Sequence, residues 1–89
     1  MNSKPEAISS IRDLVNLWPT RASLVEDLRW FSPGLKVNTP QVHKWAANGT
    51  IPARYHFPVL AAGRYRGFLI DAELMVRLHA PSQKARLDG

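Results

Sequence analysis

The residues best suited to do chemistry lie in the short segment from Thr39 to Asn48. Val42 and Trp45 are three residues apart, which places them on one side of a helix and predicts that this side is buried. The other sides carry hydrogen-bonding groups and no carboxylate, as a helix must when it enters the major groove of DNA. We therefore expect a DNA-reading helix, and its outward polar groups are Thr39, Gln41, His43 and Lys44.

No comparable set of residues serves catalysis or metal binding. His43, His56 and His79 lack the spacing of metal ligands. Asp71 and Glu73 are two residues apart, so a helix points them in different directions and they make a poor acid–base pair. The sequence has no cysteine and no glycine-rich phosphate loop. We predict that the protein is not an enzyme and that it has no catalytic residue, metal, cofactor or small-molecule ligand.

The distribution of charge favours a polyanionic partner. The chain has a formal net charge of +5 and an isoelectric point near 10.3. No Asp or Glu occurs between Asp27 and Asp71, so a positive face is expected there. The basic residues in this window are Arg29, Lys36, Lys44, Arg54, Arg64 and Arg66. An anionic membrane is a weaker candidate, because no basic amphipathic helix and no membrane-spanning apolar run stands out.

The length of 89 residues predicts one small domain. We expect a flexible N-terminus at 1–8, a folded domain at 9–80 and a flexible tail at 81–89. The start of the sequence has no apolar signal core, so we expect a cytoplasmic protein that works at the bacterial nucleoid.

The helix that carries Trp45 needs neighbours to hold it, and the sequence predicts four of them. Ser9 or Ser10 can cap a first helix, which Pro19 ends. Thr20 can cap a second helix, which we expect to end at Arg29.

Three more helices follow. Thr39 suits the cap of the third helix, with Pro40 at its first position. A fourth begins after Ile51-Pro52, and Pro58 should kink it or split off its first turn. Asp71 can cap the last. Signals for strands are weak, and at most residues 68–70 are expected to form a short extended segment. The predicted fold is an all-α compact bundle of about five helices that contains a helix-turn-helix with a lengthened turn.

The segment 42–55 follows the pattern V-x-x-W-x-x-x-G-x-I-P-x-x-Y. It resembles small phage-type Cro and repressor-like helix-turn-helix proteins, including those with carph-isopro domains, and the resemblance covers roughly Ser10 to Ala80. It implies that Tyr55 mainly packs and that the helix bearing Val42 and Trp45 reads DNA. The base-contacting positions we assign are Thr39, Pro40, Gln41, His43 and Lys44. The backbone-contacting positions are Thr20, Arg21, Lys36, Asn38, Asn48 and Arg54.

Two features depart from the family pattern. Val25 stands where a small residue is usual, and Arg29 stands where the turn glycine is usual. The expected link from Trp30 to Asn38 is also longer than the usual turn of about three or four residues. This link either packs over the core or brings Lys36 to the DNA backbone as a small wing.

These observations predict a sequence-specific regulator of the repressor type that binds a palindromic double-stranded operator as a homodimer. The expected dimer residues are Val59, Phe68, Leu69, Ile70, Leu74 and Leu78. A protein-interaction module on the same scaffold, such as an antitoxin, toxin or phage accessory protein, is the main alternative. RNA binding is another.

Overall fold

The computed structural model describes residues 8–79, and within this range the chain forms α-helices, one 3₁₀ turn and no strand. The predicted all-α bundle of about five helices is confirmed. The expected flexible segments at 1–8 and 81–89 lie outside the described residues, except Ile8, which packs against the core. The elements are α1 (Ile11–Val15), α2 (Arg21–Phe31), α3 (Thr39–Asn48), η2 (Ala53–Tyr55), α4 (His56–Tyr65) and α5 (Ala72–His79).

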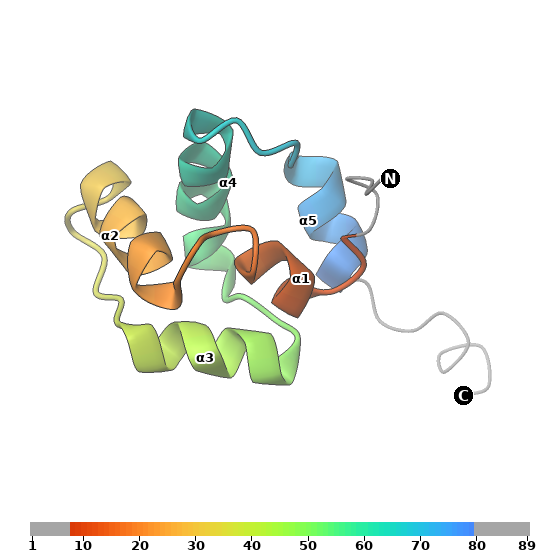
Figure 1. Cartoon of the computed structure of the whole chain (residues 1–89), viewed down its shortest axis with the longest axis horizontal. Coiled ribbons are helices and arrows are strands. Elements are labelled where there is room, and N and C mark those ends of the chain that lie inside the picture. The colour runs from red at the N-terminus through yellow and green to blue at the C-terminus, as the bar shows by residue number, and fades with distance from the viewer. Residues whose placement is uncertain (1–7, 80–89) are drawn as a thin grey trace.

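The helices surround one apolar core, and α3 lies along one edge of the molecule (Figure 1). α3 packs against α1 and α2, while α4 packs against α2 on one side and α5 on the other. Every buried residue in the described range is uncharged, so the core is held by packing rather than by internal ion pairs. None of the helices in the described range combines the length and the apolar character that crossing a membrane requires.

Three of the predicted helix caps are confirmed. The side-chain oxygens of Ser10, Thr20 and Asp71 each accept a hydrogen bond from the backbone N–H three residues later, at 3.1, 3.0 and 2.8 Å. These bonds satisfy donors that a helix N-terminus leaves unpaired. The cap of α3 is one residue earlier than predicted, at Asn38 instead of Thr39.

The first helix is shorter than expected. α1 ends at Val15. The chain then continues in tighter turns, in which the N–H groups of Leu17 and Trp18 donate to the carbonyls three residues earlier, at 3.1 and 3.2 Å. Pro19 disfavours helical geometry at the residue before it, which accounts for this change. Trp18 is nevertheless buried, with 2% of its surface exposed.

The second helix is longer than expected, and the link to α3 is correspondingly shorter. α2 continues through Trp30 to Phe31, so the connection is 32–38 and not the predicted range of 30–38. Val37 within it is buried. The connection therefore packs over the core, which was the first of the two predicted alternatives.

Two backbone carbonyls hold this connection in place. The hydroxyl of Tyr55 donates to the carbonyl of Lys36 at 2.7 Å, and the guanidinium of Arg29 donates to the carbonyl of Val37 at 3.0 Å. Because both contacts lie just before α3, they fix the point at which that helix begins.

The chain that leaves α3 is held by two histidines. The N–H of Ile51 donates to Nε2 of His79 at 2.8 Å, and the ring of His56 donates from Nε2 to the carbonyl of Ile51 at 2.6 Å. The Nδ1 of His79 in turn donates to the carbonyl of Met75 at 2.8 Å. Both imidazoles therefore satisfy backbone groups. The η2 turn that follows confirms that Pro58 splits the first turn from α4.

Candidate nucleic-acid interface

The inward side of α3 fixes the helix to the rest of the domain. Val42, Trp45 and Ala46 are 0%, 5% and 7% exposed. The ring of Trp45 lies against the ring of Tyr55, with centroids 4.9 Å apart. The hydroxyl of Tyr55 also donates to the connection before α3. Tyr55 therefore contacts both the inward side of α3 and the segment that leads into it.

The outward side of α3 is exposed along its length. Its members recur at helical spacing on one side and form what we call the outer strip: Pro40, His43, Lys44, Ala47 and Asn48. At 1.5 Å of rise per residue this strip is about 12 Å long, a length that a major groove accommodates. It contains no carboxylate. Of the predicted base-contacting residues, the structure thus brings Pro40, His43 and Lys44 onto one surface.

Gln41 occupies a different place. Its backbone N–H donates to Oδ1 of Asn38 at 2.9 Å, and its Oε1 accepts from the N–H of Asn38 at 2.8 Å. This reciprocal pair is a capping box, and the spacing of Asn38 and Gln41 was a readable signal for it in the sequence. Reading an adenine needs both ends of the amide in one orientation, and the orientation of the Gln41 amide is set by its bond to Asn38. Thr39 beside it is half-buried.

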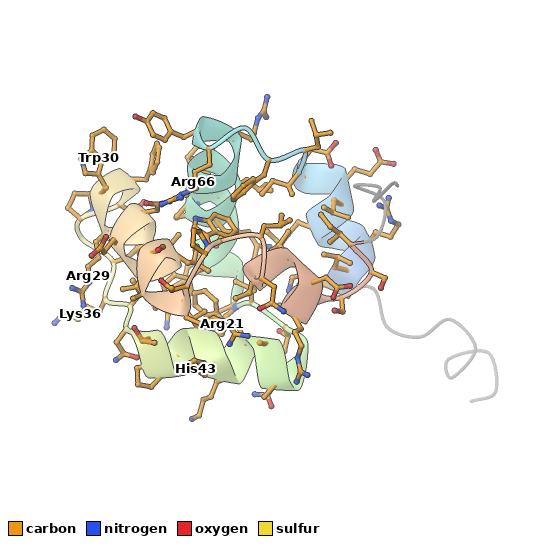
Figure 2. All side chains as sticks on the ribbon, viewed as in Figure 1. Arg21, Arg29, Trp30, Lys36, His43 and Arg66 are labelled. Carbon is orange, nitrogen blue, oxygen red and sulfur yellow. The ribbon has the colours of Figure 1, made fainter. Side chains whose placement is uncertain are left out.

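His43 is joined to α2 by a contact that sequence reasoning did not identify. Nη1 of Arg21 donates to Nδ1 of His43 at 3.0 Å, and Nη2 of Arg21 donates to Oδ1 of Asn16 at 3.0 Å. Figure 2 shows Arg21 directly above His43. Because arginine only donates, Nδ1 of His43 acts as the acceptor. In the neutral ring the hydrogen is then on Nε2, which is left as a donor.

Three cations come from elements that precede, follow or contact α3. Arg21 stands on the first turn of α2, Lys36 in the connection before α3, and Arg54 in the η2 turn that follows it. Lys36 and Arg54 are exposed, and the guanidinium of Arg54 lies 5.3 Å from the ring centre of Tyr55. Three separate elements therefore present positive charge near α3. The remaining predicted backbone contacts, Thr20 and Asn38, use their side-chain oxygens as helix caps.

A hollow of about 620 Å³ opens beside the start of α3. Arg29, Lys36, Asn38 and Gln41 contribute its polar lining. The sequence analysis counted Arg29 among the basic residues of the acid-free window but assigned it no contact, so its place here was missed. An arginine close to Lys36 in a window without acids was the available signal.

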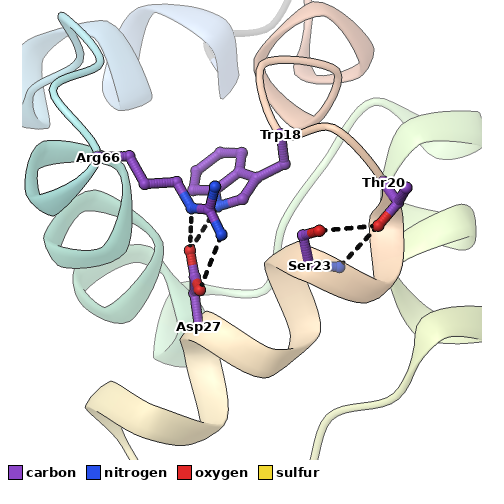
Figure 3. A network of polar contacts seen from close by, with 5 residues as sticks. All are labelled: Trp18, Thr20, Ser23, Asp27 and Arg66. Carbon is purple, nitrogen blue, oxygen red and sulfur yellow. Dashed lines mark hydrogen bonds and ion pairs between the residues drawn. The ribbon is translucent and has the colours of Figure 1, made fainter.

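The positive charge of Arg66 is compensated within the fold, so Arg66 does not add to the positive face expected between Asp27 and Asp71. It forms an ion pair with Asp27, whose carboxylate also accepts from Nε1 of Trp18 at 2.9 Å (Figure 3). Partial burial acts to raise the pKa of Asp27, but the hydrogen bonds from Arg66 and Trp18 and the charge of Arg66 outweigh it and lower that pKa. The same pair raises the pKa of Arg66.

Three of the six predicted dimer residues lie in the core of the single chain, and the dimer itself stays a prediction. Val59, Ile70 and Leu74 are 0%, 4% and 7% exposed, so they belong to the core of a single chain and are not accessible to a second one. Phe68 and Leu78 are partly buried against the same core. Leu69 alone among the six is mostly exposed.

No cluster of three or more His, Asp or Glu side chains that could hold a metal ion occurs within residues 8–79. No family model, curated protein or solved structure matches this chain.

Proposed function

We propose that the protein binds double-stranded DNA with sequence preference and acts as a small transcriptional regulator of the repressor type. One observation carries this proposal: the outer strip of α3 is exposed and free of acids while the opposite side of the same helix is locked into the core. A helix held in this way can enter a major groove as a rigid unit. Such a regulator would work in the cytoplasm, at the nucleoid.

The roles of the side chains follow from their places. Lys44 and the Nε2–H of His43 are donors suited to the acceptor atoms of guanine in the major groove. Arg21, Lys36 and Arg54 come from elements that contact, precede and follow α3 and would neutralise phosphates, which supplies affinity without sequence information. One short helix reads only a few base pairs. A palindromic site bound by two copies would extend the recognised sequence.

Selection of bound sequences from a random duplex pool tests the proposal directly. We expect an enriched motif with two related half-sites spaced about one helical turn apart. Lys44→Ala should relax the preference at one or two base pairs within each half-site, at about 1–3 kcal/mol of discrimination.

Arg77→Ala provides a matched control, because Arg77 is exposed on α5, a helix that is not part of the outer strip. It removes one positive charge and should leave the enriched motif unchanged. Absence of any enriched motif, or equal effects of the Lys44 and Arg77 variants on specific and random duplex, would reject the reading surface.

A further inference from the structure

Three aromatic side chains converge where α2 and α4 end. The rings of Trp30 and Phe31 are 5.2 Å apart between centroids, those of Phe31 and Tyr65 are 5.8 Å apart, and those of Trp30 and Tyr65 are 6.4 Å apart and inclined by 27°. Together with Glu26 and Asp27 they line a cleft of about 300 Å³, which we call the aromatic cleft.

Two of the three aromatic walls of this cleft are not used to build the core, while Phe31 packs against it. Trp30 is 74% exposed and Tyr65 is 77% exposed, whereas Trp18 and Trp45 are buried. Large aromatic residues that share an exposed cleft mark a binding surface more often than isolated exposed ones do.

The aromatic cleft is lined by acids, whereas the segment between Asp27 and Asp71 has basic residues and no acid. Glu26 and Asp27 are the last acids before a long window that has none. Arg66 compensates Asp27 through their ion pair, and Glu26 forms no ion pair with another residue of the described range. Arg29, the next cation on α2, is directed to the carbonyl of Val37. The groups at the cleft therefore sum to one negative charge.

We propose that the aromatic cleft binds the cationic side chain of an arginine on a partner protein. Aromatic faces attract cations through their quadrupoles, within about 6 Å of the ring centre. A flat guanidinium also stacks on such faces, which favours arginine over lysine. The acids at the rim add attraction for a cation and repel the phosphates of a nucleic acid.

This site is separate from the proposed DNA surface. Figure 2 shows Trp30 at the upper left of the molecule and His43 at its lower edge on α3, so the aromatic cleft and the outer strip are different surfaces. The inference does not depend on DNA binding, and either one can fail alone.

The test is an NMR titration of the full chain with acetyl-Gly-Arg-Gly-amide at about 0.15 M salt, where charges beyond about 8 Å are screened. The chain has three tryptophans, so three indole N–H signals report on three places. We expect the Trp30 signal to move with half-saturation on the order of millimolar, because one cation–aromatic contact is weak. The signal of the buried Trp45 should stay in place, whereas Trp18 is not a control, because its Nε1–H donates to Asp27 at the cleft.

The matched probe replaces arginine by citrulline, which keeps the shape and removes the charge. We expect no saturable shift with it. Glu26→Gln should weaken binding of the arginine peptide roughly threefold, as for an exposed charge pair, while Glu73→Gln, an equal charge change on α5, should not weaken it. Trp30→Ala should abolish the response, read from the backbone signal of Tyr65.

Equal binding of the citrulline peptide, or no effect of Glu26→Gln, would overturn the assignment of a cation site. A Trp30 signal that moves with protein concentration alone would show that a second copy occupies the cleft. A shift caused by oligothymidylate and not by the peptide would show a nucleic-acid site instead. Either of these last results overturns the proposal as well.

Discussion

The guanidinium of Arg21 donates a hydrogen bond to Nδ1 of His43 at 3.0 Å and so joins the first turn of α2 to the outer strip of α3. We expect His43 to populate the Nε2–H form, because Nδ1 must accept. The ¹⁵N shifts of the imidazole measure this directly, and a protonated Nδ1 in the neutral ring would contradict the contact. Arg21→Ala should remove the tautomer bias at a stability cost below about 1 kcal/mol, since the pair is exposed.

The dependence of duplex binding on salt should report on Arg54. If its guanidinium lies on a phosphate, Arg54→Ala will reduce the slope of log K against log salt by about 0.9 and weaken all duplexes alike. Binding measured at several salt concentrations on the selected site and on random duplex checks both parts. A variant with an unchanged slope would place Arg54 away from the DNA backbone.

The pair formed by Asp27 and Arg66 should shape stability at low pH. The folded state lowers the pKa of Asp27 below its ordinary value of 3.8, so the stabilisation is present above about pH 4 and is lost as the pH falls through the lower, folded-state value. Asp27→Asn should therefore flatten the fall of unfolding free energy in acid, measured by urea denaturation at several pH values. Arg66→Gln should have a similar effect, and the double variant should add little. Additive effects would show that the two residues act independently.

Gly63 in α4 stands where no larger residue fits. A Cβ at this position would overlap Cδ1 of Ile70 and lie 3.3 Å from the ring of Trp18. We expect Gly63→Ala to destabilise the fold by about 1–3 kcal/mol through overpacking, despite the better helix propensity of alanine.

Gly34→Ala is the matched control, because nothing lies within 4 Å of a Cβ there. It should be neutral or slightly stabilising. Thermal melts of the two variants give the comparison, and similar melting temperatures would show that Ile70 moves aside easily.

The cap of α3 should contribute measurably to stability. Asn38→Ala removes the acceptor for the N–H of Gln41 and should cost about 0.5–2 kcal/mol of unfolding free energy. Asn38→Asp keeps an acceptor and should retain most of the stability. Urea denaturation measures both, and an alanine variant as stable as the parent would show that the capping box contributes nothing.

Local signals in the sequence were sufficient for much of the fold. Ser10, Thr20 and Asp71 cap their helices as predicted, since a cap depends on residues within one turn. The end of α2 was missed because Phe31 stays helical while packed against Tyr65, a residue far along the chain. Propensity carries no information about such a contact.

The candidate site was predicted less completely. Helical periodicity placed Lys44 and His43 outward, but it could not show that Arg21 reaches His43 from another helix. Periodicity also marks apolar residues without saying which surface covers them. Val59 and Ile70 were therefore assigned to a second copy, whereas the chain's own core buries them.

The connection between α2 and α3 is held near its end, at the carbonyls of Lys36 and Val37 and by the packing of Leu35 against the core, while Pro33 and Gly34 at its tip are exposed. Lengthening a flexible loop is cheap, at about 0.6 kcal/mol for each doubling. Residues inserted after Gly34 would therefore bulge into solvent without displacing α3. This tip is the place where a fluorophore or a peptide tag can be grafted while the rest of the architecture stays as it is.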